Sequence, residues 1–560
     1  MTGDLVRRPT RTVHSLLPVL RWLPSYARAD LPRDLLAGVG VAALLIPESL
    51  GYAGIAGVPP EVGLYAAIAA LAAYAVTGGA SILVVGPASA VAALSASLVA
   101  EMGGAGADPV ALTAGLALVS GLLLVVAGLL RFGWIVHFIS RPVLHAFVAG
   151  LSISIIVGQL DGLLGTELAG ENAVRRAIHV ATHLGGWTPV TVVVGVSALV
   201  ILLVLERRLA AVPGALVVVV GGILAVWALD LRDAEGVAVL GDIPRGLPTV
   251  GLPDLGDTRW WEVVAGGMAL VLVGFSEGYA AATAIADRTG ETVDGDQELI
   301  GSGAANVASG LLGGLVVSGS LSKSAAGQAA GARTQVSNLV AAALVVATVL
   351  FLGPVFELLP EPVVAAVVIA AVLPAADPRR FWHFRNVNRL DFAAALATFT
   401  LVLVWETLPA MIVGVVLSLA FLVRRASFPD VLELRATPAG TFVRVADESP
   451  PRMPGVAVVR FEAPLVYANA ERLVAAVGEL VRTRDDLRRV VLDAEMVADL
   501  DATGAEALET LDQRLTDQGV ELRLARAHHR FRDQLERSGL AERFTGRLHE
   551  HIADAVAPTV

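Results

Sequence analysis

Runs of about twenty mainly apolar residues recur between about Leu35 and Val423, and this repetition constrains the fold more than any other feature of the sequence. A helix of that length spans the hydrocarbon core of a bilayer. Hydrophobic residues make up 55% of the chain and the mean hydropathy is +0.69, values that ordinary soluble domains do not reach. The pattern predicts a polytopic α-helical membrane protein.

The apolar runs end near residue 425, and charged, amphipathic sequence follows them. We therefore expect an N-terminal segment (1–34), a transmembrane domain (35–425), a linker with the first part of the tail (426–454) and a terminal domain (455–560). The arginine-rich N-terminal segment shows no cleavage pattern of a secretory signal. The chain has no cysteine, which excludes disulfides, thiolate metal sites and cysteine nucleophiles.

Charge is distributed unequally among the connections between the expected spans. Acidic residues gather in long connections, namely Asp230, Asp233, Glu235, Asp242, Asp254 and Asp257, and arginines gather in short ones, namely Arg207, Arg208, Arg333, Arg379, Arg380, Arg385 and Arg389. Arginine-rich connections stay on the cytoplasmic side of a membrane. We therefore expect a multi-pass protein of the bacterial plasma (inner) membrane with both termini in the cytoplasm.

A carboxylate lies at membrane depth in the first span, where Glu48 follows Pro47 in the sequence LLAGVGVAALLIPESLGYAGIAG. Pro47 removes a helix hydrogen bond. An ionisable group at this depth is costly and is a candidate functional residue. The plain alternative is that Glu48 sits at a wetted break in the helix. In the second half of the chain, Glu277 occupies the middle of the corresponding span, 261–286.

Two other spans contain interruptions. In residues 81–100, a β-branched stretch at 82–85 is followed by Gly86 and Pro87, which predicts an extended piece, a break and a half-helix that begins near Pro87. The second interruption is the sequence SGSLSKS at 318–324, where Ser320, Ser322, Lys323 and Ser324 are expected to open another half-helix. Irregular backbone at this depth is tolerated only where it lines a cavity or is buried in protein.

Lys323 is the sole lysine of a chain that otherwise carries its positive charge on arginine. The pKa of lysine shifts readily on burial, whereas arginine stays charged. The free amides of a helix N-terminus favour an anion, so we expect Lys323 and the surrounding serines to face one. The alternative is that a single lysine falls here by chance.

The interruptions lie in the third span of each half, and Glu48 and Glu277 lie in the first span of each. We count seven spans in each half, with repeats at about 35–229 and 261–423. Interrupted segments at corresponding places indicate an inverted-repeat transporter whose site lies at the midplane, between the two half-helices.

The sequence DLLAGVGVAALLIPESLGYAGIAGVPPEVGLYAA, the sequence SRPVLHAFVAG at 140–150 and the run 274–324 resemble the SulP family of anion transporters, the sulfate permease relatives of prestin and pendrin. This resemblance implies fourteen transmembrane helices in a 7+7 inverted repeat, divided into core and gate domains that move like an elevator. It also implies a homodimer and an anion held between the third and tenth helices.

Carried onto this chain, the resemblance implies a substrate-binding site with these members: Glu48, Gly86, Pro87, Ala88, Ser89, Ser320, Leu321, Ser322 and Lys323. Glu277 matches the acidic position that carries the coupling proton in proton-driven members, where sodium-driven relatives have Asp. Glu48 departs from the family pattern, because the usual residue after Ile-Pro is Gln. A smaller departure is Asp296, which stands where Asn is usual.

Glu48, Glu277 and an anion cannot comfortably all be charged in one cavity that holds a single Lys323. We expect one or both carboxyl groups to be protonated when the anion is bound, which would couple proton movement to anion movement. The sequence leaves open whether Glu277 or Glu48 is the proton carrier.

The tail alternates short β-branched strands with amphipathic helical patterns, which predicts a small α/β domain. Thr503, in the sequence Asp-Ala-Thr-Gly at 501–504, is expected to cap a helix. The segment resembles the STAS domain that SulP proteins share with anti-sigma-factor antagonists, in which a hydroxyl residue of this loop is phosphorylated. Thr503 is therefore a possible regulatory residue, and a plain cap is the alternative.

These observations favour a secondary active transporter of a small inorganic anion, not an enzyme, with proton-coupled sulfate uptake as the leading expectation. Bicarbonate or a dicarboxylate is the alternative substrate, and an anion channel or an anion-sensing receptor that signals through the STAS domain is the alternative class. We expect no cofactor, metal or nucleic acid. The expected partners are the anion, a proton, the lipid bilayer, a second copy of the chain and a cytoplasmic protein bound to the STAS domain.

Overall fold

The computed structural model describes residues 17–102, 108–134, 140–170, 172–208, 214–241, 246–255, 260–377, 379–405, 407–437, 440–444 and 452–558. Asp242, Asp257 and residues 1–16 lie outside these ranges. The chain forms two compact units, Met1–Ser418 and Leu419–Val560, which are described in turn. Among the described residues of the chain, seven helices are long and apolar enough to cross a membrane, and several shorter apolar helices accompany them.

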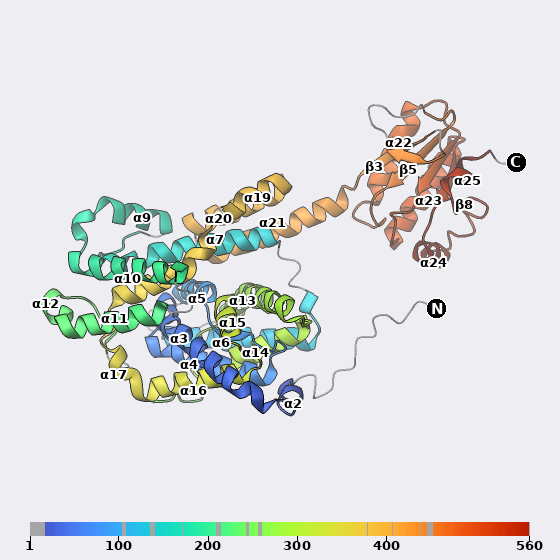
Figure 1. Cartoon of the computed structure of the whole chain (residues 1–560). Helices are drawn as coiled ribbons and strands as arrows, with labels where there is room; N and C mark the ends of the chain where they lie inside the picture. The colour runs from blue at the N-terminus through green and yellow to red at the C-terminus, as the bar shows by residue number, and fades with distance from the viewer. Residues whose placement is uncertain are drawn as a thin grey trace. The chain divides into compact units, whose positions relative to one another are not determined.

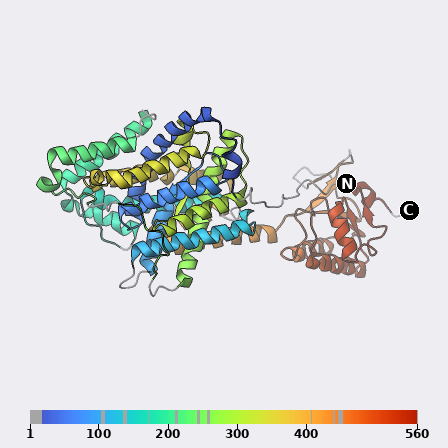
Figure 2. The same ribbon diagram turned by 90° about the horizontal axis from the view of Figure 1, so that it is seen from below.

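The first half of the helical unit contains α3 (Leu31–Ile55), α4 (Pro60–Thr77), β1 (Val84–Pro87), α5 (Ser89–Met102), α6 (Pro109–Leu129), α7 (Arg141–Gly158), α10 (Pro189–Arg208) and α11 (Gly214–Leu229). Shorter helices are α2 (Val19–Trp22), α8 (Leu160–Leu164), α9 (Ala173–Thr182) and α12 (Leu231–Glu235). The helices lie side by side in one bundle (Figures 1 and 2).

The second half contains α13 (Trp260–Thr289), α14 (Gly295–Leu311), β2 (Val317–Ser320), α15 (Leu321–Ala329), α16 (Val336–Ala347), α17 (Gly353–Phe356), α18 (Glu361–Val372), α19 (Arg379–Val387), α20 (Arg389–Val404) and α21 (Thr407–Ser427). A π-helical turn, Thr348–Leu352, joins α16 to α17. Corresponding elements of the two halves therefore follow the same order, with a strand and a short helix in the third place of each.

The structure corrects several expected boundaries. The half-helix of the first interruption begins at Ser89, and Pro87 is the last residue of the preceding strand. In the second half, the chain turns at Pro360 before α18 begins, so α17 and α18 are separate helices. The helix α3 continues through Pro47 without ending, so Glu48 does not lie at a helix break.

Glycines allow the helices α6 and α14 to pack closely against each other. At Gly310 on α14, a Cβ would lie 2.6 Å from the backbone nitrogen of Leu118 on α6, and at Gly121 on α6 it would lie 2.4 Å from the backbone nitrogen of Val307. Small residues of this kind let helix backbones approach in a membrane, where apolar burial alone gives no driving force. The interface of α6 and α14 therefore depends on the absence of side chains.

Replacing Gly310 by Ala should destabilise the helical unit by about 1–3 kcal/mol, because the new methyl group overlaps the backbone of α6. Gly221→Ala is the matched control, since nothing lies within 4 Å of a Cβ on that exposed helix position. The control should be neutral or slightly stabilising, because Ala favours helix over Gly by up to about 1 kcal/mol. Thermal unfolding of both variants in detergent checks this, and equal melting temperatures would contradict it.

Exposed tryptophans lie at the helix ends of one face of the bundle. Trp227 is near the end of α11, Trp260 and Trp261 begin α13, and Trp405 follows α20, with exposed fractions of 55–73%. Successive helices of the bundle run in opposite directions, so the end of α11, the start of α13 and the end of α20 lie on the same face. Tryptophan is enriched at the boundary between lipid and water, so this face, the tryptophan face, is one boundary of the membrane-embedded region.

The second unit is an α/β domain with a six-stranded sheet in the order β4-β3-β5-β6-β7-β8. Its strands are β3 (Val431–Ala436), β4 (Phe442–Arg444), β5 (Val456–Phe461), β6 (Arg489–Asp493), β7 (Glu521–Ala525) and β8 (Leu548–His549). Its helices after α21 are α22 (Ala470–Thr483), α23 (Ala502–Asp517), α24 (His529–Arg537) and α25 (Ile552–Val556). Strands β5 to β8 are parallel, and β3 is antiparallel to both β4 and β5.

The alternation of side chains along the strands gives this sheet two buried faces. Val459 and Leu492 face the core that α22, α23 and α24 cover, whereas Val458 and Val491 face the smaller core that contains Ile552 of α25. The predicted alternation of strands and amphipathic helices is thus explained by a sheet with helices on both sides. The sheet also includes β3 and β4, which fall in the range 426–454.

Asp512 on α23 is a buried carboxylate held by two arginines. Arg543 Nε donates to Asp512 Oδ2 and Arg547 Nη1 donates to Oδ1, each at 2.6 Å. Burial raises the pKa of Asp512, but the hydrogen bonds from Arg547 and Arg543 lower it by more, so the pKa lies below its ordinary value. Because the folded pKa is below the unfolded one, the ionised form stabilises the domain above pH ~4 and this contribution is lost as the pH falls through the folded pKa.

Asp512→Asn should therefore lower the stability of this domain by about 1.5–3 kcal/mol at pH 7. At pH 3 the difference from the unchanged chain should shrink, because the wild-type carboxylate then loses its charge as well. Hydrogen–deuterium exchange at the amides of α23 and β7 in the full-length protein, corrected for intrinsic rates, measures both differences. A difference of the same size at both pH values would contradict the assignment.

Candidate functional site

The two interruptions of the helical unit pair with each other. Strand β1 lies antiparallel to β2, with Val84 opposite Ser320, Val85 opposite Gly319, Gly86 opposite Ser318 and Pro87 opposite Val317. Each strand leads directly into a short helix, α5 or α15. The sequence predicted an extended piece only at the first interruption, and the structure adds its partner. Within the described residues, the strand pair joins the two halves of the bundle at the point where both helices begin.

The register of this pair is symmetric. The shift in residue number that carries Val84 onto Val317 also carries Pro87 onto Ser320. Under that shift, the pair Val84–Ser320 becomes the pair Val317–Pro87, and Val85–Gly319 becomes Ser318–Gly86. The pair therefore maps onto itself when the two halves are exchanged, as an inverted repeat with a two-fold axis through the strands requires.

Side-chain amides and hydroxyls satisfy the backbone next to the paired residues. Asn306 exchanges two hydrogen bonds of 2.9 Å with the backbone of Val317. Val84 N donates to Ser324 Oγ at 2.8 Å. Asn338 donates to the carbonyl of Leu83 at 2.7 Å. Because unpaired backbone groups are costly at membrane depth, these polar side chains are what allow short strands to exist there.

Glycine brings α13 against β2. A Cβ on Gly319 would lie 2.9 Å from Gly278 Cα, and a Cβ on Gly278 would lie 3.1 Å from Gly319 N, so a side chain at either position would crowd the contact. Ser318 Oγ donates to the carbonyl of Gly274 at 2.7 Å, which ties the strand to the same helix. Glu277 is therefore placed beside the strand pair, half-buried, and its carboxylate has no hydrogen bond or ion pair among the residues that the structure describes.

Lys323 is 1% exposed, and its charge is paired within the protein. Its Nζ lies 2.6 Å from Glu48 Oε2 and donates to the carbonyl of Pro87 at 3.1 Å. The same nitrogen lies 5.1 Å from the ring centre of Tyr52, whose hydroxyl donates to Glu48 Oε2 at 3.3 Å. Lys323 thus connects α15, α3 and the end of β1.

This ion pair changes the charge expected at the site. The sequence predicts that Lys323 faces an anion, and in the structure Glu48 neutralises the charge of Lys323 at contact distance. Two unit charges about 4 Å apart interact by about 4 kcal/mol at an effective dielectric constant of about 20. The remaining attraction for an anion comes from the helix N-termini, whose free amides carry partial positive charge.

The N-terminus of α15 is open on one side. Ser320 caps the helix, its Oγ accepting from the Lys323 amide at 3.4 Å and lying 3.1 Å from Ser322 Oγ. Leu321 is 44% exposed and Ser322 is also exposed, although Lys323 is buried. At the start of α5, Ala88 and Ser89 are half-buried. Hydroxyls and amides are therefore accessible next to a buried, charge-neutral pair.

The structure gathers most of the predicted site residues around this strand pair: Glu48, Gly86, Pro87, Ser320 and Lys323 by direct contacts or pairing, and Ala88, Ser89, Leu321 and Ser322 at the two helix starts. Sequence reasoning missed Tyr52, Ser324 as the partner of Val84, and Asn306. Tyr52 could have been found, since residues four apart share one face of a helix and Glu48 is four residues earlier.

Thr503 does not cap its helix, contrary to the prediction. The N-cap of α23 is Asp501, whose Oδ1 accepts from Gly504 N at 2.7 Å. Thr503 is exposed on the first turn of α23. The prediction that Thr503 caps the helix is therefore wrong, and its regulatory role stays a prediction.

Comparison with known proteins agrees with this architecture. The sequence profile of the sulfate permease family matches residues 31–398, and that of the STAS domain matches residues 450–555. A probable sulfate transporter of Mycobacterium tuberculosis is 34% identical, with 96% of each chain covered. Probable sulfate transporter 3.3 of Arabidopsis thaliana is 28% identical, with 98% of this chain and 91% of that chain covered.

Solved structures share the fold at 22% sequence identity. Murine Slc26a9, described as an anion transporter, superposes with a TM-score of 0.88 over 99% of this chain and 96% of its own. The transmembrane domain of the cyanobacterial bicarbonate transporter BicA gives 0.61 over 70% of this chain and 98% of its own. The fold and its paired interruptions define a multi-pass helical membrane transporter with a STAS domain.

The chain belongs to the sulfate permease family. Members of this family are transporters, so the protein is a transporter and not an enzyme.

Ser324→Ala should lower the stability of the helical unit by about 1–3 kcal/mol, because it leaves the buried amide of Val84 without its acceptor. Ser322→Ala, at the exposed position two residues earlier, should change stability by less than about 0.5 kcal/mol. Thermal unfolding in detergent compares the two variants. A smaller loss for Ser324→Ala than for Ser322→Ala would show that the strand is anchored in another way.

Proposed function

We propose that the protein takes up a small oxyanion, with sulfate as the leading substrate, by symport with a proton that Glu48 carries. The observation behind this proposal is the contact of 2.6 Å between Glu48 and Lys323, next to the open N-terminus of α15. The names of the relatives support sulfate. The description of BicA keeps bicarbonate as an alternative substrate.

The physical argument is one of charge. When Glu48 is ionised, its pair with Lys323 is neutral, and an anion meets only amides and hydroxyls. Protonation of Glu48 removes the negative charge and leaves Lys323 with net positive charge beside the helix start. An anion then binds more tightly, and by linkage a bound anion favours the protonated carboxyl group to the same degree. Proton and anion therefore bind together and leave together.

Glu277 is the alternative proton carrier. It lies on α13 beside β2 and has no ion-pair partner among the described residues, so its charge is not matched by Lys323. A carboxyl group in that setting can take up a proton without changing the contacts of Lys323. We favour Glu48 because its protonation acts directly on the cation at the site.

The movement that carries the site across the membrane is proposed from the fold. The strand pair, α3, α13 and α15 form one packed group, and α7 packs on α20 in another part of the bundle. We propose that the first group, with the site, moves as a body against the second in an elevator-like exchange. Arg207 and Arg208, in the last turn of α10, support a cytoplasmic location for the helix ends opposite the tryptophan face.

Glu48→Gln should abolish the dependence of sulfate uptake on an inward proton gradient while sulfate–sulfate exchange continues, because the amide that replaces the carboxyl group does not bind and release a proton near neutral pH. In the wild type, each pH unit of gradient supplies about 1.4 kcal/mol per proton, enough for up to about tenfold accumulation. Uptake of labelled sulfate into proteoliposomes, with and without the gradient, measures this. Glu235→Gln, at an exposed residue of α12, is the control and should behave as the wild type.

The same assay distinguishes the alternatives. If Glu48→Gln remains as gradient-dependent as the wild type and Glu277→Gln loses the dependence, Glu277 is the carrier. If unlabelled bicarbonate or fumarate competes more strongly than unlabelled sulfate, that anion and not sulfate is the preferred substrate. Electrical currents without any gradient dependence in either variant would indicate a channel.

A further inference from the structure

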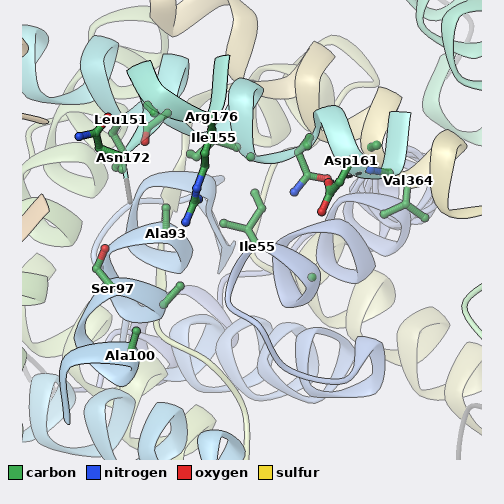
Figure 3. A pocket seen from close by; sticks show the side chains of 18 of the residues that line it. Ile55, Ala93, Ser97, Ala100, Leu151, Ile155, Asp161, Asn172, Arg176 and Val364 are labelled. Atoms are coloured by element: carbon green, nitrogen blue, oxygen red, sulfur yellow. Dashed lines mark hydrogen bonds between the residues drawn. The ribbon is translucent and has the colours of Figure 1, made fainter. Parts of the chain in front are cut away.

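A cavity of about 1000 Å³ lies among α3, α5, α7, α8, α9, α18 and α20. Its walls contain Ile55 at the end of α3, Ala93 and Ala100 on α5, and Leu151 on α7 (Figure 3). The predicted substrate-binding residues, all of which the structure describes, do not line it. The cavity is thus a separate feature, one helical turn along α5 from Ser89.

Among the described residues that line this cavity, Arg176 is the single basic one. Its side chain extends from α9 toward Ala93 and Ile55 (Figure 3). Its Nε donates to the carbonyl of Gly170 at 3.0 Å, which fixes the base of the guanidinium group. No ion pair or hydrogen bond to its two terminal nitrogens is found within the part of the chain that the structure describes. A guanidinium group has five N–H donors, so the donors at the tip remain for a ligand.

The loop before α9 is shaped to hold this arginine. Gly170 has a φ of 134°, a conformation that side chains disfavour, and a Cβ there would lie 2.9 Å from Arg175 Cβ and from the Arg176 amide. Asn172 caps α9 by accepting from the Arg175 amide at 3.0 Å, and its own amide donates to the carbonyl of Val404 at 3.1 Å. The position of Arg176 is therefore set by contacts to both the loop and α20.

Carboxylates share the cavity with Arg176. Glu101, Asp161 and Glu361 line it, so the cavity carries more negative than positive charge when all three are ionised. An anion that enters is repelled by these groups and attracted by Arg176. The affinity of the cavity for an anion should therefore fall when Arg176 is lost and rise when a carboxylate is neutralised, two changes of opposite sign.

The cavity lies at the tryptophan face. Trp405 lines it, and so do residues at the ends of α3 and α5 that the connectivity brings to the same face. The arginine-rich connections lie at the opposite helix ends. In the orientation proposed above, the cavity faces the outside of the cell.

We propose that this cavity is an outer anion-binding site, in which Arg176 binds a small oxyanion or carboxylate before it reaches the strand pair. The inference rests on the proposed transport function and adds a residue to it. Guanidinium matches the oxygen spacing of sulfate and of carboxylates, with two parallel hydrogen bonds. The floor of the cavity is apolar, with Ile55, Ala93 and Val364 packed against the core cluster that surrounds α5.

The test is sulfate uptake by whole bacterial cells that lack their own sulfate uptake and express the full chain. Arg176→Gln should raise KM by about tenfold or more with Vmax within about twofold, because the lost contacts are charge-assisted. Arg176→Lys should recover part of the change, and Asp161→Asn should lower KM. Arg175→Gln, on the preceding residue of α9, is the matched control and should leave KM unchanged. Bicarbonate and fumarate as competitors identify the preferred anion.

Sidedness is checked in the same cells, since the chain has no cysteine of its own. A membrane-impermeant maleimide should label Glu235→Cys on α12 and not Asn386→Cys on α19, both at exposed positions. Labelling of the second residue alone would place the cavity in the cytoplasm and overturn its role as an outer site.

Two failures can be told apart. If the wild type takes up sulfate and Arg176→Gln has an unchanged KM, or loses only Vmax, the site is rejected and the transport function stands. If the wild type takes up none of the three anions, calorimetric titration of sulfate into purified protein decides. If the wild type binds sulfate and Arg176→Gln binds it more weakly, the site stands and the transport function is rejected. If Arg176→Gln binds sulfate as tightly as the wild type, the site is rejected. If the wild type binds no sulfate, both are rejected.

Discussion

The antiparallel pairing of β1 with β2 is the interaction on which the helical unit depends. Two helices that start in the middle of a membrane leave backbone amides and carbonyls without partners, and the lipid offers none. Each interruption supplies the partners of the other, and Asn306, Ser324 and Asn338 satisfy groups beside them. The two accessible helix starts are possible only because this pairing exists.

The ion pair of Glu48 and Lys323 depends in turn on that pairing, since the carbonyl of Pro87, at the end of β1, accepts a hydrogen bond from Lys323. Removing one partner of a buried ion pair leaves an uncompensated charge, which costs about 3–5 kcal/mol. A proton on Glu48 creates this same imbalance reversibly. In the proposed mechanism, a bound anion supplies the missing charge, so an unfavourable state of the empty protein becomes the favourable state of the loaded one.

Sequence patterns predicted the helical class, the two interruptions and the α/β tail, because apolar length, Gly-Pro breaks and strand alternation are local properties. They did not predict that β1 pairs with β2, since the two lie more than two hundred residues apart and neither shows alternation over its four residues. The contact of Lys323 with Glu48 was beyond reach for the same reason. The role of Thr503 as a cap failed because Asp501, a better cap two residues earlier, competes for the same amides. Arg176 gave no signal, since its importance comes from a cavity that distant helices enclose.

The symmetric register of the strand pair has a consequence for the origin of such a chain. A pair that maps onto itself needs no difference between its two strands, so a polypeptide with one set of seven spans can form it with an identical copy inserted upside down. Fusion of the two copies frees each strand to diverge. Lys323 follows β2, whereas the corresponding position after β1 is Ala90, so the charge chemistry breaks a symmetry that the backbone keeps.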